Sequence, residues 1–287
     1  TGVQTCALPI YSLALGWGTM VIYGAAYQLV PVIFERPLSS SRLAFSTYIL
    51  LTLGTCLLVY SFWHFKIGLL MCLGGLLITL SSYLYFYTLW MTTKDVEHLF
   101  ELRLYFTLSA FWLCFTTTLG LLLAINLFHG FLTKSHLDIL KLHAHVGIVG
   151  WFLQLILGAG AKMLPMFLLG RSAKTKWLYV SIILINLGLV LFLLDGYTHP
   201  VGLRSLIFGV IVLLGVICWA VFVVDCYIHR ARKILDIPMK HSFISFLSLL
   251  FAFFTLPMVV QQQFGSWVNL YFVWLFFGWI TGLILGM

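Results

Sequence analysis

The sequence predicts an all-α fold: a polytopic membrane helix bundle with about nine transmembrane segments. Of its 287 residues, 62% are hydrophobic and only 8% are charged, and the mean hydropathy is +1.07. These values are far from those of a soluble globular domain. Apolar runs of about 20 residues, enough to cross a bilayer, recur along the whole chain. A third observation is an internal repeat whose spacing leaves room for four such helices.

The repeat is a Gly-Trp motif that occurs three times. GWGTMVIYGAAYQLVP begins at Gly16, GWFLQLILGAGAKMLP begins at Gly150, and an incomplete copy, GWITGLILGM, begins at Gly278. The copies are 134 and 128 residues apart. This spacing predicts four-helix arcs within a single membrane domain over 11–287. Arc 1 covers 11–128, arc 2 covers 142–260, and the start of arc 3 covers 267–287.

The first ten residues, TGVQTCALPI, are similar to a translated sequencing-adapter tail. We therefore expect 1–10 to be non-native and exclude it from fold reasoning. Because this tail stands in place of the true start and the third motif copy is incomplete, we expect a fragment truncated at both ends. Tyr11 precedes its motif glycine by five residues, as His145 precedes its own. One base change separates the codons of tyrosine and histidine, and we hypothesise that the native residue at position 11 is histidine.

Nine apolar segments are expected in chain order, and the first, fifth and ninth carry the repeat copies. They cover 11–34, 43–63, 67–91, 104–128, 142–169, 177–194, 203–225, 242–260 and 267–287. The longest polar stretch is 226–241, CYIHRARKILDIPMKH, which we interpret as a connector that could form an amphipathic helix at the membrane surface.

Loop charges orient these segments. The loops after segments one, three, five and seven carry eleven lysines and arginines, and the opposite loops carry four. The positive-inside rule assigns the first set to the cytoplasm, so His143 and His145 are expected near the outer face. The net charge of +8 fits lipid headgroups better than nucleic acid, because no basic helix or arginine-rich run occurs. We expect an integral protein of the bacterial cytoplasmic membrane, with the lipid bilayer as its partner and no nucleic acid.

The fifth segment carries the candidate site, because ionisable groups in a membrane helix are costly and are functional candidates. Two residues turn a helix by about 200°, so His143 and His145 are expected on nearly opposite faces. His143 shares its face with glycines and Gln154, which favours a close helix seam. His145 shares an apolar, aromatic face that suits an axial haem ligand.

Plainer interpretations of these residues stay open. A lone histidine in a membrane helix can simply hydrogen-bond a neighbouring helix. Lys162 can extend its ammonium group to the cytoplasmic surface, or it can line a polar proton path. Tyr27, Gln28 and Gln154 are the other candidates for such a path, and Gln28 matches Lys162 in the first repeat copy.

Three arcs of four helices, with a histidine near the outer end of a leading helix, resemble subunit I of the haem–copper oxidases. The stretches LHAHVGIVGWF, LPMF and GAAYQLVPVIFE are similar to small oxidase-subunit-I-like proteins related to nitric-oxide-response membrane haem proteins. The resemblance implies haem bound through His145, paired with the histidine hypothesised at position 11. It also implies His143 as a supporting residue or metal ligand, and copper as a second metal.

Parts of that family's pattern are missing from the sequence. The paired copper histidines are absent from 177–194, and so is the histidine-proline-x-x-tyrosine element. The third motif copy has Tyr271 and Val273 where haem ligands would be sought. The resemblance therefore implies haem binding without a complete oxygen-reducing site.

Three functions remain as alternatives. The first is a membrane haem-binding protein in respiratory electron transfer or nitric oxide handling, an oxidase-like oxidoreductase if it is active, with an electron donor or other respiratory subunits as partners. The second is a cofactor-free transporter or channel that uses the polar path. The third is a structural subunit of a respiratory complex.

Overall fold

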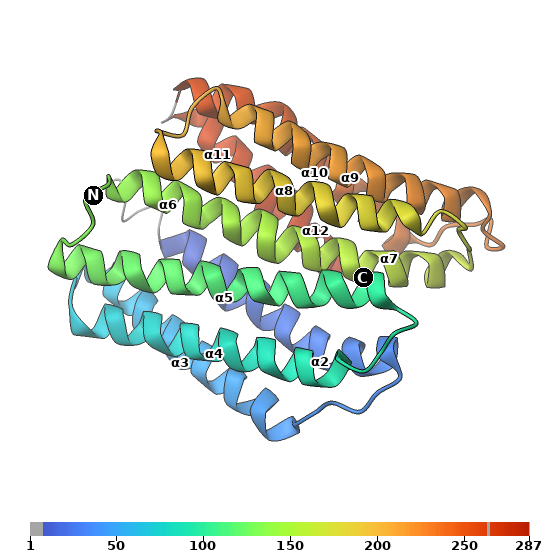
Figure 1. The fold of residues 1–287 in the computed structure, drawn as a ribbon, viewed down its shortest axis with the longest axis horizontal. Helices are drawn as coiled ribbons and strands as arrows, with labels where there is room; N and C mark the ends of the chain where they lie inside the picture. The colour runs from blue at the N-terminus through green and yellow to red at the C-terminus, as the bar shows by residue number, and fades with distance from the viewer. Residues whose placement is uncertain (1–7, 263–264, 287) are drawn as a thin grey trace. The chain divides into compact units, whose positions relative to one another are not determined.

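The computed structural model describes residues 8–262 and 265–286, so most of the expected adapter-derived tail, residues 1–7, lies outside the described part. Within it, nine helices are long and apolar enough to cross a membrane, and no strand occurs. The predicted all-α polytopic bundle is confirmed (Figure 1). The elements are, in order, η1 (Ser12–Thr19), α2 (Met20–Phe34), α3 (Ser41–Trp63), α4 (Leu69–Thr93), α5 (Phe100–His129), α6 (His136–His145), η2 (Val146–Leu153), α7 (Gln154–Leu168), α8 (Lys176–Thr198), α9 (Ser205–Ile228), α10 (Ile237–Gln262), α11 (Ser266–Phe272), η3 (Val273–Thr281) and α12 (Gly282–Gly286).

The nine helices agree with the nine expected segments to within a few residues. The largest difference is at the fifth, expected over 142–169, whose helix already begins at His136. The added turn contains Asp138 and Lys141, which form an ion pair with 3.2 Å between Oδ1 and Nζ. Oppositely charged residues three apart support a helix in water. Hydropathy therefore marked where the apolar stretch starts and not where the helix starts.

Each copy of the repeat begins inside a π-helix: η1, η2 or η3. The motif glycine lies inside each π-helix, which ends three residues after that glycine in all three copies. π-Helical turns are rare and are frequent at functional sites. The threefold repeat in sequence is therefore also a threefold repeat in backbone structure.

The first two copies also end alike. The residue after each helix, Glu35 or Leu169, adopts a left-handed conformation with φ of 52° or 49°. The next amide then donates to the carbonyl of the proline inside the helix. These bonds join Arg36 N to Pro31 O (3.1 Å) and Gly170 N to Pro165 O (2.9 Å). A bond of this kind satisfies a carbonyl that the helix end would leave unpaired.

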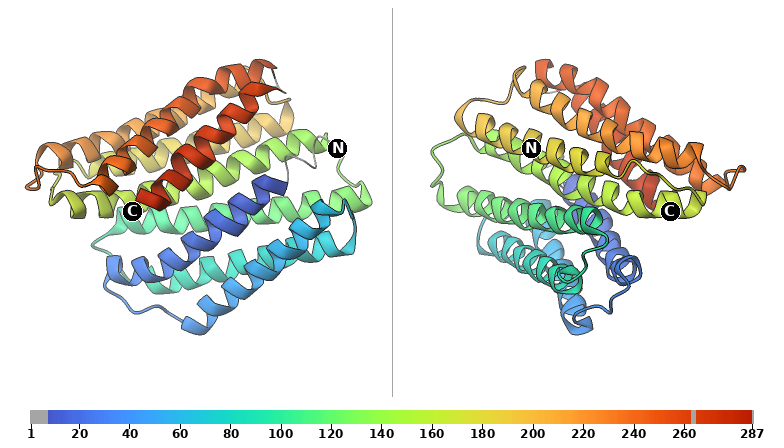
Figure 2. Two further views of the ribbon diagram at one scale, coloured as in Figure 1. Left: turned by 180° about the vertical axis from the view of Figure 1, so that it is seen from behind. Right: turned by 45° about the vertical axis from the view of Figure 1, so that its right-hand side comes forward.

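The chain divides into two compact units, with the division after Leu155. In the first unit, α3, α4 and α5 run side by side in alternating directions (Figure 1). In the second unit, α8 packs on α9, and α10 lies beside the last helix, α11–η3–α12 (Figure 2). The long helix α6–η2–α7 belongs to both units.

The same close helix crossing occurs in both units. A Cβ atom added to Gly54 of α3 would lie 2.8 Å from the carbonyl oxygen of Gly74 on α4. A Cβ atom added to Gly188 of α8 would lie 3.0 Å from the carbonyl oxygen of Phe208 on α9. Both pairs of positions differ by 134 residues, which is the offset of the motif. The duplication therefore extends to the second and third helices of the first two arcs, beyond the sequence motif.

Candidate functional site

His145 is the last residue of α6 and directly precedes η2. Its Nδ1 lies 2.8 Å from the carbonyl oxygen of Lys141, one turn earlier. A carbonyl can only accept, so Nδ1 carries the hydrogen and the lone pair of the neutral imidazole is on Nε2. A hydrogen bond of this kind orients most histidines that bind metals. Nε2 is therefore the atom with which His145 could bind iron.

His143 packs against α5. Its Nδ1 lies 3.0 Å from the carbonyl oxygen of Thr116. Gly120 makes room for the ring, because a Cβ atom there would lie 2.8 Å from the imidazole Cε1. Gly147 approaches the same helix, with its virtual Cβ atom 3.2 Å from the Thr116 methyl group. The face of His143 thus forms the close helix seam expected of its small residues.

Tyr11, where we hypothesise a native histidine, lies beside His143. The ring centroids of Tyr11 and His143 are 6.4 Å apart, and Tyr11 stacks on Phe62 at 5.2 Å. Since both positions belong to the first unit, a histidine at position 11 would be a neighbour of His143.

The donor set fits haem better than copper. No group of three or more His, Cys, Asp or Glu side chains able to hold a metal occurs among the described residues. His143 and His145 are bonded to different elements, α5 and α6. A copper centre built on protein ligands would need more donors than these two. Haem brings four porphyrin nitrogens and needs only one or two axial ligands from protein.

The expected polar-path residues have different surroundings. The Tyr27 hydroxyl lies 2.7 Å from Thr47 Oγ1, whereas the neighbouring Gln28 is exposed. Gln154 is completely buried, and Lys162 is half-buried in the second unit. Tyr27 and Gln28 therefore have different surroundings within the first unit, and the polar path stays a prediction.

Tyr27 instead belongs to a buried aromatic cluster that sequence reasoning missed. Tyr23 and Tyr85 stack with ring centroids 4.1 Å apart, and Trp151 meets both edge-on at 6.3 and 5.5 Å. The Trp151 indole donates to Thr19 Oγ1 at 3.3 Å, which links the first two motif copies. The one available signal was Trp151, the tryptophan of the Gly-Trp motif. Tyr85, the residue of α4 that Trp151 contacts, follows no pattern in the sequence.

Tyr85→Phe is expected to leave the stability unchanged or to raise it by about 1 kcal/mol. The Tyr85 hydroxyl is buried and has no hydrogen-bond partner in the described part of the chain. Its desolvation therefore costs free energy on folding, and phenylalanine avoids that cost. Tyr27→Phe, the matched control, removes the bond to Thr47 and should cost about 1 kcal/mol. Thermal unfolding in detergent measures both. A larger loss for Tyr85→Phe would mean that this hydroxyl binds something in the native protein.

The first unit carries two apolar grooves, of about 430 and 300 Å³. The larger runs between η1 and α3 and the smaller between α4 and α5. Neither is lined by a histidine, so both are separate from His143 and His145. Their linings are Ser12, Gly16, Trp17, Met20, Thr52, Thr55, Cys56 and Val59, and Tyr83, Phe86, Phe111, Cys114, Phe115 and Thr118.

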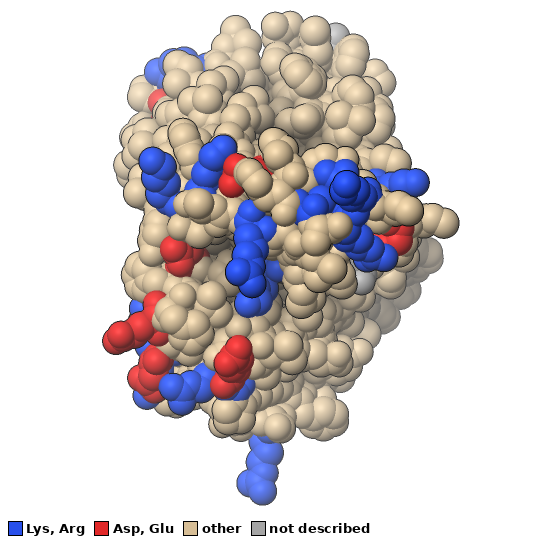
Figure 3. Space-filling view, turned by 90° about the vertical axis from the view of Figure 1, so that its right-hand side faces the viewer, with Lys and Arg blue, Asp and Glu red and all other residues tan. Residues whose placement is uncertain are grey.

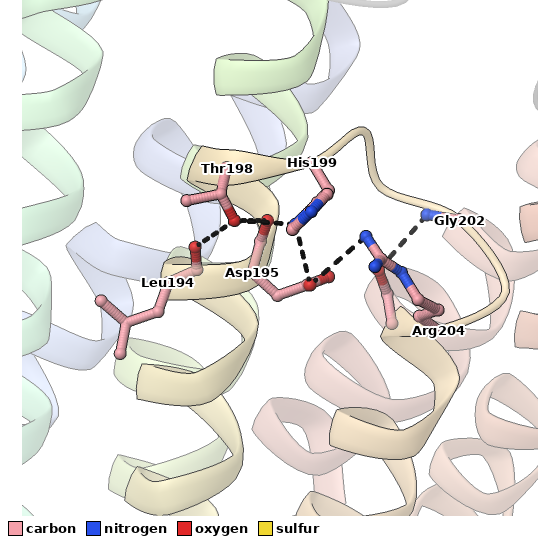
Figure 4. A network of polar contacts seen from close by, with 7 residues as sticks. Leu194, Asp195, Thr198, His199, Gly202 and Arg204 are labelled. Atoms are coloured by element: carbon pink, nitrogen blue, oxygen red, sulfur yellow. Dashed lines mark hydrogen bonds and ion pairs between the residues drawn. The ribbon is translucent and has the colours of Figure 1, made fainter.

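A polar network in the second unit joins the end of α8 to the start of α9 (Figure 4). Asp195 Oδ1 lies 3.4 Å from His199 Nδ1 and 3.4 Å from an Arg204 guanidinium nitrogen. The Thr198 hydroxyl lies 2.8 Å from the same histidine nitrogen. Both partner side chains are more than half exposed, at 52% and 58%, so these ion pairs add little stability. The network connects the two ends of the loop between α8 and α9, and we interpret its role as structural.

Comparison of the chain with protein-family models, with curated proteins and with solved structures finds no match. The class that the fold defines is an all-α integral membrane protein, whose apolar helices indicate contact with the lipid bilayer.

Proposed function

We propose that this integral membrane protein binds haem and acts in respiratory electron transfer or nitric oxide handling. One observation carries the proposal: His145 directly precedes the π-helix of the repeat, and its Nδ1 is held by the Lys141 carbonyl. That bond orients the ring and raises the basicity of Nε2. Bound haem would supply one-electron redox chemistry or a site for a diatomic gas.

Apolar residues that follow His145 on its own helix suit an apolar cofactor. Val146 and Phe152 are buried, and the Phe152 ring packs on Gly18 of the first repeat copy, where a Cβ atom would lie 3.1 Å from it. Apolar side chains keep water from a haem pocket and so tune its reactivity. In this proposal His145 holds the iron, and His143 supports the helix through its bond to Thr116.

The proposal includes a location and partners. The loop charges favour the bacterial cytoplasmic membrane with both histidines toward the outer face. An electron donor or other respiratory subunits would then reach the protein, which would work as an oxidase-like oxidoreductase. Copper is the second metal that the resemblance implies, and the described residues contain no group of three or more donors for it.

A reduced-minus-oxidised optical spectrum of the purified full-length protein tests the proposal. We expect a Soret band and about one haem per chain, since one histidine near the repeat motif serves as the ligand. A haem precursor is added during expression, so that a shortage of haem cannot explain a missing Soret band. A folded, colourless protein would contradict the proposal, and ion or solute flux in liposomes would then test the transporter alternative.

A further inference from the structure

We propose that the second unit binds the phosphate headgroup of an anionic phospholipid at the end where α7 and α9 finish. The site consists of the loop 170–176 and the connector 229–236, which follow these two helices. This inference does not depend on haem binding.

Positive charge is in excess at this end of the second unit and not at the corresponding end of the first. In the first unit, the loops 35–42 and 94–103 carry four cations and four carboxylates. In the second, 170–176 and 225–240 carry seven cations and two carboxylates. Figure 3 shows lysine and arginine side chains gathered on the face of the molecule where these loops lie. The positive-inside rule concerns cytoplasmic loops in general, so it does not explain a difference between two of them.

Both carboxylates of this end already have partners. Asp225, whose side chain is 8% exposed, accepts from the Ser172 hydroxyl at 2.7 Å and from Lys174 Nζ at 3.0 Å. Asp236 pairs with Arg232 at 3.2 Å. The remaining cations form no ion pair within the described residues, and they are Arg171, Lys176, Arg230, Lys233 and Lys240. Five cations of one surface therefore lack a counter-charge among the residues that the structure describes.

Arg230, one of these five cations, has an unused donor. Its guanidinium carbon lies over the Tyr227 ring, 3.8 Å from the centroid, and one terminal nitrogen donates to the Tyr227 carbonyl at 2.6 Å. Its Nε is buried and has no acceptor among the described residues. A guanidinium group matches two phosphate oxygens at once. A small side-chain rotation toward a phosphate would give Nε the acceptor that it lacks.

The two segments are fixed to each other by their backbones. Two amide-to-carbonyl bonds join Ala231 to Leu169 (3.2 Å) and Arg232 to Leu168 (3.3 Å). Gly170 lies directly against the carbonyl of Cys226, where an added Cβ atom would collide. Because the segments are held in place, binding an anion would cost less ordering than at two free loops.

Exposed isoleucines beside the cations distinguish a lipid from a free anion. Ile234 and Ile237 are 84% and 82% exposed, the highest values among the large hydrophobic residues of the described chain. Between α9 and α10 the chain is not helical, so the amphipathic helix considered for 226–241 is not formed across the connector. A membrane surface offers phosphates to the cations and acyl chains to the isoleucines together, whereas free phosphate would leave Ile234 and Ile237 in water.

Lipid binding to the full chain in detergent, measured by native mass spectrometry, tests the proposal. Phosphatidylglycerol should bind at least tenfold more tightly than phosphatidylcholine with the same acyl chains. The triple variant Arg171→Gln, Arg230→Gln, Lys233→Gln should lose most of this preference, on the order of fivefold per cation. The matched triple variant of the first unit, Arg36→Gln, Arg42→Gln, Lys94→Gln, should keep it. Equal loss in both variants, or in neither, would overturn the proposal.

Competition with inorganic phosphate is the second part of the test, and it is carried out on the unmodified protein. Millimolar phosphate should not displace phosphatidylglycerol. The double variant Ile234→Ser, Ile237→Ser should weaken lipid binding several-fold, and circular dichroism checks that it is folded. Displacement of the lipid by phosphate at equal affinity would assign the site to a free anion and refute the lipid.

Discussion

His145→Ala is expected to remove haem from the protein, with Soret absorbance per chain falling at least tenfold. The expectation rests on the proposed function, in which the imidazole Nε2 is the protein's bond to iron. Lys141 holds Nδ1 at 2.8 Å, so no other atom of His145 could take that role. The measurement is the optical spectrum of the purified variant beside the unmodified protein, at matched protein concentration and with haem supplied during expression.

Two other histidines of the same helix are the controls. His136→Ala changes the first residue of α6 and should leave the spectrum unchanged. His143→Ala removes the bond to Thr116, which should lower the stability by about 1 kcal/mol and retain the haem. A spectrum lost in His143→Ala and kept in His145→Ala would show that the ligand is His143, and would refute the assignment to His145.

Free imidazole separates ligand loss from misfolding. In His145→Ala the truncated side chain leaves space beside the iron, and added imidazole should restore part of the Soret band. The same addition should leave the haem content of the unmodified protein unchanged. A His145→Ala protein that binds haem fully without imidazole would contradict the proposed ligand.

The sequence predicted the helices and the repeat because both depend on local patterns. Apolar runs of membrane length and a Gly-Trp motif at fixed offsets are visible residue by residue. The π-helices are not, because one additional residue per turn leaves the apolar composition of the segment unchanged. The crossing at Gly54 and Gly188 was also missed, since it depends on which backbone lies opposite each glycine.

The candidate site was predictable in part. The sequence predicted His143 and His145 as candidate site residues because ionisable groups are rare in apolar segments. The stack of Tyr23 on Tyr85 unites α2 and α4 and needs the tertiary structure. The connector 226–241 was considered as an amphipathic helix because it is the longest polar stretch of the sequence. Pro238, the second residue of α10, was an available signal, because proline favours the first turn of a helix and breaks a helix interior.

Gly54→Ala is expected to destabilise the protein by about 1–3 kcal/mol, as overpacking of a tight contact does. The new Cβ atom would lie 2.8 Å from the carbonyl oxygen of Gly74 and 2.8 Å from a side-chain carbon of Ile78. The isoleucine can turn away, but the carbonyl belongs to the backbone of α4. The two helices must therefore separate, and they lose the dispersion contacts that hold membrane helices together.

Gly24→Ala is the matched control, because no atom lies within 4 Å of its virtual Cβ atom. Alanine favours a helix over glycine by about 1 kcal/mol, so this variant should be neutral or slightly more stable. Gly188→Ala repeats the test in the second unit, where Phe208 presents its carbonyl at the equivalent position. Thermal unfolding in one detergent compares all three variants. If the crossing is a duplicated element, Gly54→Ala and Gly188→Ala lower the midpoint together. A loss at only one of them would mean that the two crossings share their geometry but not their importance for stability.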